Sequence, residues 1–198
     1  MRACAAWRSM VYTNAVRGRK RLTRLRLPLL LAGYFVVSPA IALGFQAAGV
    51  RPANKVMTAL FEEGTNRSAS FRGLLERIAD AHGIVYVEFG HCAFGHLNGC
   101  LLPYVVPTTG GRYLRIVVTP DDTRVSHDRL IALIAHELQH ALEVLAHPEV
   151  VDIDSMLAMY ARIGRPLEGR AGYETSEAHR VEDAVLDELT ARRPRPII

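Results

Sequence analysis

One 20-residue segment, residues 127–146, constrains the fold more than any other part of the sequence. Its apolar side chains recur around most of the circumference of a helix, at Leu130, Ile131, Leu133, Ile134, Leu138, Leu142 and Leu145. A helix with so little polar surface must be buried along most of its girth. Two histidines and two glutamates lie within its residues 136–143, and a charge inside a buried helix is costly unless it is paired or bound to a metal ion. The segment therefore predicts a central helix whose polar residues have a specific role.

The four polar residues of interest are His136, Glu137, His140 and Glu143. Because each helical residue advances by about 100°, His140 and Glu143 lie about 40° and about 20° to either side of His136. The pattern His-Glu-x-x-His is typical of a zinc site: two imidazoles one turn apart can bind one metal ion, and the adjacent Glu137 can accept the proton of a water molecule. Two histidines and a carboxylate suit Zn²⁺. The alternative is a pair of buried histidines satisfied by neighbouring carboxylates.

The segments around this helix predict an α+β fold. Apolar positions at helical spacing and β-branched or aromatic runs mark the other elements. They predict a helix over residues 68–82, strands over 84–89, 100–106 and 113–118, and helices over 151–163 and about 173–192. We expect a small, mostly antiparallel sheet packed on the buried His-Glu-x-x-His helix, followed by two further helices.

The first 42 residues are expected to be an export signal or a membrane anchor. They are Arg-rich and contain no acidic residue, and the apolar stretch at residues 27–45 includes Ala40-Ile41-Ala42, which suits cleavage after Ala42. If this stretch is retained, it is about long enough to tether the protein to a membrane. The rest divides into a linker at residues 43–67, with one or two helical turns expected over residues 54–63, a metal-binding domain at 68–192 and a tail at 193–198.

The distribution of charge argues against nucleic acid as a partner. The whole chain has a net charge of +4 and a pI near 9.2, but 8 of its 24 basic residues lie in the leader. The remaining 156 residues carry 16 basic and 20 acidic side chains, a net charge of −4. The basicity therefore belongs to the leader, and the expected location is the periplasm, the cell exterior or a membrane surface.

The stretch His136-Glu137-Leu138-Gln139-His140, on a helix that follows a strand, resembles the zincin metallopeptidases. The third histidine of the metzincins is absent, so the resemblance is to the gluzincin branch, and in particular to its small single-domain members. In that branch a glutamate from a later helix completes the metal site. The resemblance covers roughly residues 84–190. It implies an exported peptidase that hydrolyses peptide bonds with a Zn²⁺-activated water and with Glu137 as general base.

Three glutamates compete for the place of the third ligand. Glu174 opens a helix about 34 residues after His140, which suits the gluzincin plan, and Glu177 lies one turn further on. Glu143 faces the metal side of the motif helix, but it is better placed to orient His140 from behind. The plan also expects an acidic residue four positions after the ligand glutamate, and this sequence has Ala178 there.

The resemblance also implies a donor for the oxyanion and an extended peptide or protein substrate. Tyr173, Tyr160 and His179 are the candidate donors, and the strand at residues 113–118 is expected to pair with the substrate by strand addition. The alternative function is a non-catalytic domain of the same type, whose metal site is structural or serves partner or peptide binding. The short chain favours this alternative, whereas the presence of Glu137 favours the enzyme.

The cysteines outside the leader form an even pair, Cys92 and Cys100, on either side of a glycine-containing loop. In an exported protein such a pair predicts a disulfide that closes the loop. The alternative is a second metal site formed with His91 and His96, although the spacing of these residues matches no zinc pattern.

Overall fold

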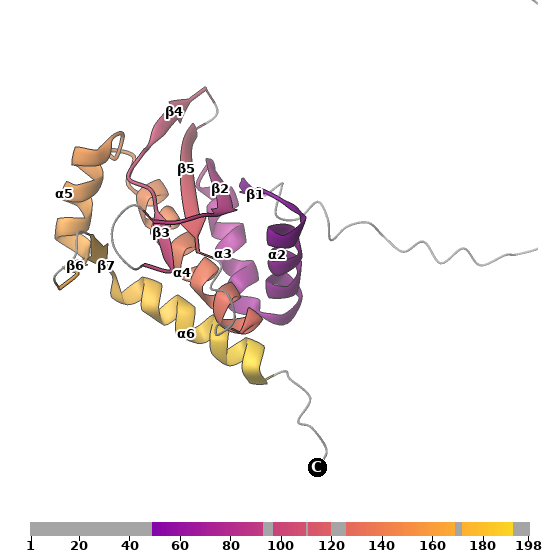
Figure 1. The fold of residues 1–198 in the computed structure, drawn as a ribbon. Coiled ribbons are helices and arrows are strands. Elements are labelled where there is room, and N and C mark those ends of the chain that lie inside the picture. The colour runs from indigo at the N-terminus through magenta and orange to yellow at the C-terminus, as the bar shows by residue number, and fades with distance from the viewer. Residues whose placement is uncertain (1–48, 93–96, 110, 120–125, 169–171, 192–198) are drawn as a thin grey trace, which may run out of the picture. The chain divides into compact units, whose positions relative to one another are not determined.

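The computed structural model describes residues 49–92, 97–109, 111–119, 126–168 and 172–191. The expected leader (1–42) and tail (193–198) lie outside these residues. In chain order the elements are β1 Val50–Pro52, α2 Lys55–Arg67, α3 Ala69–Asp80, β2 Gly83–Phe89, β3 Gly99–Leu101, β4 Val106–Thr108, β5 Gly111–Val118, α4 His127–Ala146, α5 Ile153–Ile163, β6 Arg165–Pro166, β7 Tyr173–Glu174 and α6 Ser176–Ala191 (Figure 1). The described part contains no helix that is long and apolar enough to cross a membrane.

The main sheet is mixed, with strand order β1-β2-β5-β3 and with β4 also paired to β5. β1, β2 and β5 run parallel, and the β2–β5 ladder extends from Gly83↔Arg112 to Phe89↔Val118. Only β3 and β4 are antiparallel to β5. The α+β class is therefore correct, but the expectation of a mostly antiparallel sheet is wrong. An alternating apolar pattern identifies a strand without giving its direction, and here α2 and α3 form the crossover that makes β1 and β2 parallel.

The position of β5 corrects a second expectation. Residues 113–118 were expected to accept a substrate strand, but β5 is an interior strand, with β2 on one side and β3 and β4 on the other. Its backbone groups are already paired, so it has no free edge. The edge beside the motif helix is β3, which pairs only with β5 among the described strands.

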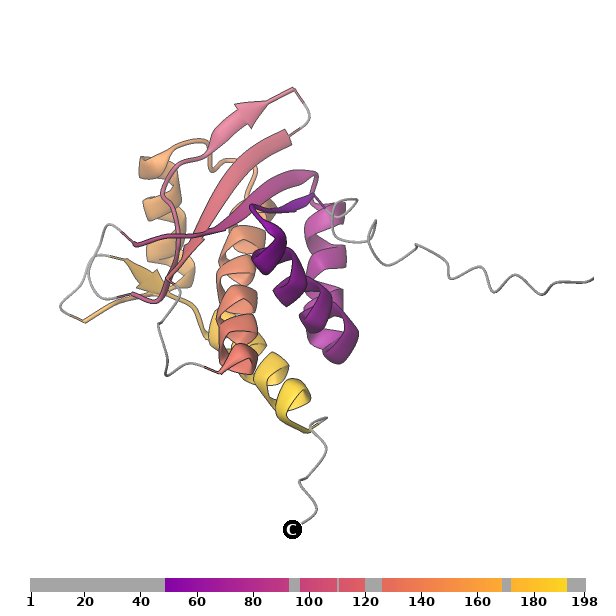
Figure 2. The ribbon, with the colours of Figure 1, turned by 45° about the vertical axis from the view of Figure 1, so that its right-hand side comes forward.

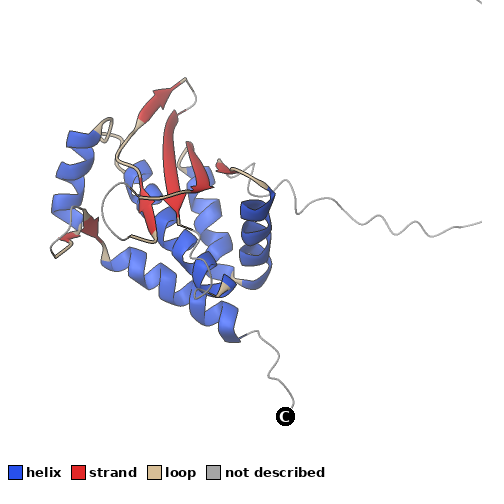
Figure 3. Cartoon of the chain, in the orientation of Figure 1, coloured by secondary structure: helices blue, strands red, loops and turns tan. Residues whose placement is uncertain are grey.

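The helices α2, α3 and α4 cover one face of the sheet, and α6 crosses below α4 on the side away from the sheet (Figures 1 and 2). The side chains of β2 and β5 alternate accordingly: Val85, Val87, Leu114 and Ile116 are fully buried beneath the helices. Arg115 points the other way and is exposed. Figure 3 shows the strands as one layer against these helices. α4 therefore lies in the core, between the sheet and α6.

Residues 43–67 were expected to be a linker, but those that the structure describes belong to the fold. β1 pairs with β2, and α2 begins at the N-cap Asn54 and runs to Arg67. Met57 and Phe61 are fully buried. Gly64 lies inside this helix, although glycine is typical of helix breaks, and a Cβ there would lie 2.9 Å from Ile131 Cγ2. This glycine lets α2 pack closely on α4.

The motif helix has the bounds that its sequence predicts, His127–Ala146, with Ser126 as N-cap. Its C-terminal end is held by Arg112, the second residue of β5. The guanidinium donates hydrogen bonds to the carbonyl oxygens of Val144, Leu145, His147 and Val150, at 2.6–2.9 Å. A cation satisfies the carbonyls that every helix leaves free at this end. Strand β5 and α4 are thereby fixed to one another.

Candidate metal centre

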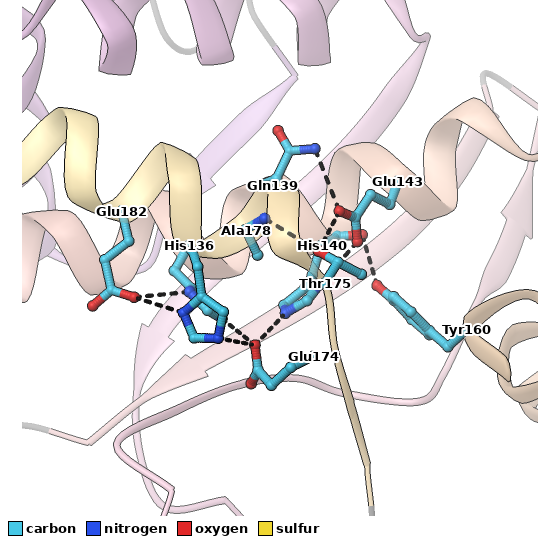
Figure 4. Close-up of polar contacts among 10 residues, drawn as sticks. His136, Gln139, His140, Glu143, Tyr160, Glu174, Thr175, Ala178 and Glu182 are labelled. Carbon is cyan, nitrogen blue, oxygen red and sulfur yellow. Dashed lines mark hydrogen bonds and ion pairs between the residues drawn. The ribbon is translucent and has the colours of Figure 1, made fainter. Parts of the chain in front are cut away.

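Two ring nitrogens of α4 face one carboxylate oxygen of β7 (Figure 4). Glu174 Oε2 lies 3.0 Å from His136 Nε2 and 3.6 Å from His140 Nε2. Both histidines are buried, with 5% and 6% of their surface exposed. The hairpin β6–β7 delivers Glu174 to this place, where it meets the motif helix 34 residues away in the sequence. Of the three glutamates considered from the sequence, Glu174 is the one brought to both Nε2 atoms.

The opposite nitrogen of each ring is held by a second carboxylate. His136 Nδ1 lies 2.9 Å from Glu182 Oε2, and His140 Nδ1 lies 3.0 Å from Glu143 Oε2. An Nδ1–H that donates to a carboxylate fixes the ring and leaves Nε2 free to bind a metal ion. Both imidazoles are therefore oriented from behind, with their Nε2 atoms aimed at Glu174.

Glu143 is itself held by the start of α6. The Thr175 hydroxyl donates to Glu143 Oε1 at 2.7 Å and accepts a hydrogen bond from the Ala178 amide at 3.1 Å. Thr175 is buried, so this link is protected from water. The chain from Ala178 through Thr175 and Glu143 to His140 couples the position of α6 to the orientation of one imidazole.

Glu137 is also buried, with 5% of its surface exposed, and it lies against the edge strand. A Cβ at Gly99 would come within 2.7 Å of Glu137 Oε1, so only glycine allows β3 to approach this closely. Burial raises the pKa of Glu137, although the two histidines and the Leu101 amide act in the opposite direction. The carboxylate thus has a proton affinity above that of an exposed glutamate.

The imidazoles and carboxylates of this cluster shift one another's pKa values strongly. Burial lowers the pKa of His136, but Glu174 and Glu182 outweigh this effect and raise that pKa to about 10. In the same way Glu143 and Glu174 overcome burial and raise the pKa of His140 to about 9. Burial alone would raise the pKa of Glu174, whereas the two histidines hold it far below its usual range. Positive charge is therefore strongly favoured between these groups.

The donor set fits a tetrahedral metal ion. Zinc bonds of 2.0–2.2 Å place neighbouring ligand atoms about 3.3 Å apart, and the observed separations of 3.0 and 3.6 Å bracket this value. Glu174 Oε2 is buried and makes only ion-pair contacts with the rings, without a well-directed hydrogen bond. His136, His179 and Glu182 form a second group of the described residues with ligand atoms close together, but His179 is exposed, whereas His136 and His140 are both buried.

The remaining residues singled out from the sequence have other surroundings. The Tyr160 hydroxyl donates to the His140 carbonyl at 3.0 Å, and its ring stacks on that of Tyr173. His179 Nε2 lies 3.5 Å from Glu174 Oε2, which places an exposed imidazole at the edge of the cluster. Glu177 is paired with Arg180 on the surface and makes no contact with the two histidines among the described interactions.

Cys92 and Cys100 form a disulfide, with their Cα atoms 6.0 Å apart. The predicted pairing is therefore present, and the alternative second metal site is not supported, because the two sulfur atoms are bonded to one another. His96 lies outside the described residues. The disulfide joins the loop that follows β2 to β3, beside the candidate metal centre.

Sequence reasoning missed Glu182, Thr175 and Gly99. The gluzincin plan has an acidic residue at the position that Ala178 occupies here. Glu182 lies four residues later, and positions four apart share one face of a helix, so the sequence did contain a signal for Glu182. Thr175 precedes α6 as a capping residue would, but its link to Glu143 depends on the tertiary packing of α6. No local pattern marks Gly99, because its role arises only when β3 meets α4.

Comparisons of this chain with models of protein families, with curated proteins and with solved structures find no match. The geometry and chemistry of the described residues are consequently the basis on which a function can be inferred.

We expect Glu182→Gln to weaken zinc binding by about 10- to 100-fold, because it removes the negative charge that holds His136 from behind. Competition with a chromogenic chelator measures this affinity. The matched control is Asp183→Asn, since Asp183 is the exposed neighbour of Glu182 and faces away from the ring. Equal affinities of the two variants would show that Glu182 does not position His136.

Zinc should stabilise the protein more at high pH than at low pH. The pKa values of His136 and His140 are raised from 6.5 to about 10 and about 9 in the metal-free fold. Their contribution to metal-free stability is therefore complete below the unfolded value and is lost as the pH rises through about 9–10. Zinc requires neutral imidazoles and competes with these protons. Thermal unfolding with zinc and with chelator, between about pH 6 and pH 8.5, should show a growing increment in Tm. A constant increment would contradict binding at this pair.

Proposed function

We propose that this chain is a zinc-dependent peptidase that acts in an oxidising compartment. The observation that carries the proposal is the meeting of His136 Nε2, His140 Nε2 and Glu174 Oε2 at one point beside the buried carboxylate of Glu137. A hydrolytic zinc site usually has three protein ligands and an adjacent general base, whereas a structural zinc site usually has four protein ligands. The residues gathered here have the first composition.

His136, His140 and Glu174 would hold the metal ion, which when bound supplies a Lewis acid that polarises the scissile carbonyl and acidifies water. Glu137 would take a proton from the attacking water and deliver it to the leaving amine. Its raised pKa suits this role, because a general base works best when its pKa lies closer to the working pH. Glu182 and Glu143 would keep the imidazoles in position and leave their Nε2 atoms free.

A peptide is the substrate class that the surroundings of Glu137 favour. β3 is an edge strand next to this carboxylate, and a sheet edge binds extended peptides through main-chain hydrogen bonds. His179 is better placed than Tyr160 as an oxyanion donor, because it is exposed beside Glu174, whereas the Tyr160 hydroxyl already donates to the His140 carbonyl.

The disulfide Cys92–Cys100 supports an exported location, since such bonds persist mainly outside the cytosol. The proposed export signal or membrane tether belongs to residues outside the described part. Export and the disulfide agree in pointing to the periplasm, the cell exterior or the outer face of a membrane.

Metal removal tests the proposed function. We expect about one zinc ion per chain by elemental analysis and hydrolysis of a peptide library or casein. A chelator should abolish hydrolysis, and addition of stoichiometric zinc should restore it. Bound zinc without hydrolysis of any peptide would favour a structural or peptide-binding role, and the absence of bound metal would contradict both.

A further inference from the structure

A cavity of about 330 Å³ opens directly beside the metal centre. Glu137, His140 and Glu174 line one end of it. The rest of the wall is largely apolar and comes from β3, α5 and the β6–β7 hairpin, and includes Leu97, Leu101, Met156, Leu157, Leu167 and Tyr173. Its volume is near the lower end of the range for ligand pockets, about 300–1,000 Å³. It therefore has room for one large side chain or two smaller ones.

The edge strand offers its backbone groups toward this cavity. Asn98 accepts from the Thr119 amide at 2.7 Å, and Leu102 donates to the Arg115 carbonyl at 2.8 Å. Alternate residues of an antiparallel strand bond to the same neighbour, so Cys100 also faces β5, whereas the amides and carbonyls of Gly99 and Leu101 face the free edge. The Leu101 amide meets Glu137 there. A peptide paired with the Gly99 amide and with the Gly99 and Leu101 carbonyls would pass next to Glu137.

The ends of β3 differ, and this difference gives a direction to a bound peptide. The large cavity is lined by Leu101 and Pro103 together with Glu137 and His140 from the middle of α4, and it also reaches Leu97. Asn98 instead lines a second cavity of about 160 Å³ with Arg129 and Leu133 from the first turns of α4. A peptide that pairs antiparallel to β3, the slightly more stable arrangement, has its N-terminal part beside Leu101 and its C-terminal part beside Asn98. The residues before the scissile bond then face the large apolar cavity.

We infer, on the basis of the proposed peptidase function, that this chain selects peptides by a large apolar side chain on the N-terminal side of the scissile bond. The ionisable groups that line the large cavity lie at its metal end, and the far end is apolar. At its rim Ile153 and Leu157 are 43% and 44% exposed. A leucine, methionine or phenylalanine side chain removes this apolar surface from water, whereas a charged side chain would be desolvated without a partner.

Cleavage of quenched fluorescent peptides tests the inference in the full-length, zinc-loaded protein. Peptides that carry leucine before the scissile bond should have a kcat/KM roughly 10- to 100-fold higher than those with alanine. Mass spectrometry of the products identifies which bond is cleaved. Anisotropy titration of the same labelled peptides against Glu137→Gln reports their affinity without turnover, and the leucine peptides should again bind more tightly.

A charge introduced at the rim separates specificity from folding. Leu157→Glu should change the ratio of kcat/KM for leucine and lysine peptides by about 10-fold or more in favour of lysine. The matched control is Val56→Glu, which places the same charge at an exposed valine of α2 and should leave the ratio unchanged. A gain of activity toward lysine cannot result from misfolding.

The outcomes distinguish this inference from the function on which it rests. Equal rates and equal affinities for leucine and alanine peptides would overturn the apolar cavity as the selecting site. A leucine preference that appears after the scissile bond would overturn the direction. Preferential binding of leucine peptides by a protein that hydrolyses none would support the cavity and refute the peptidase function.

Discussion

Replacing Glu137 by glutamine should lower kcat/KM for peptide hydrolysis by about 10²- to 10⁴-fold, the usual contribution of a general base. The amide has the same shape as the carboxylate, so it fits the space that Gly99 leaves, and its oxygen can still accept a hydrogen bond from the Leu101 amide. It has no basic site for a water proton. Because Glu137 is not one of the three groups that converge on the metal position, the zinc content should be unchanged.

The thermal stability of Glu137→Gln should also be preserved. Burial raises the pKa of Glu137, which means that the folded protein disfavours the negative charge, and a neutral amide avoids this cost. Elemental analysis and calorimetry accompany the kinetic assay, and Glu76→Gln, an exposed site on α3, is the matched control. Full activity of the Glu137 variant in the presence of bound zinc would refute the proposed mechanism.

The sequence predicts the elements of this domain better than their arrangement. The helical period of residues 127–146 is unambiguous, because a helix buried on most sides repeats its apolar residues around its whole circumference, and the observed helix has the same bounds. The direction of β2 relative to β5 has no corresponding pattern in the sequence, because a strand has the same apolar pattern in either direction. α2 was expected only as one or two helical turns within a linker, because Gly64 is typical of a helix break, whereas in the fold this glycine lets Ile131 approach.

The same division holds for the candidate metal centre. His136, Glu137 and His140 share one helix, so their relative positions follow from helical geometry and can be predicted from spacing. Glu174 and Glu182 come from β7 and α6, and their distances to the imidazoles depend on how α6 packs across α4. The fold thus brings to both imidazoles the carboxylate that the sequence favoured among three candidates, by contacts that the sequence alone does not specify.

The substitution Glu174→Gln should reduce the affinity for zinc by more than roughly 100-fold, which exceeds the effect expected for groups that only orient a ligand. A ligand carboxylate supplies both a bond and a negative charge, and an amide oxygen is a weaker, neutral donor for zinc. Glu174 Oε2 faces both Nε2 atoms, and among the described residues it is the carboxylate that completes a ligand group with His136 and His140.

Glu177→Gln is the sharpest control, because Glu177 is the competing candidate from the sequence and lies only three residues further on. Its carboxylate is paired with Arg180 on the exposed side of α6, so its replacement should leave zinc affinity within about twofold. Zinc titration of both variants against a competing chelator decides between them. If Glu177→Gln lost zinc and Glu174→Gln kept it, α6 would have to turn to bring the other carboxylate inward, and the metal centre described above would be wrong. If the zinc affinity of both variants fell only as far as their metal-free Tm fell, the loss would result from a destabilised fold and not from the removal of a metal ligand.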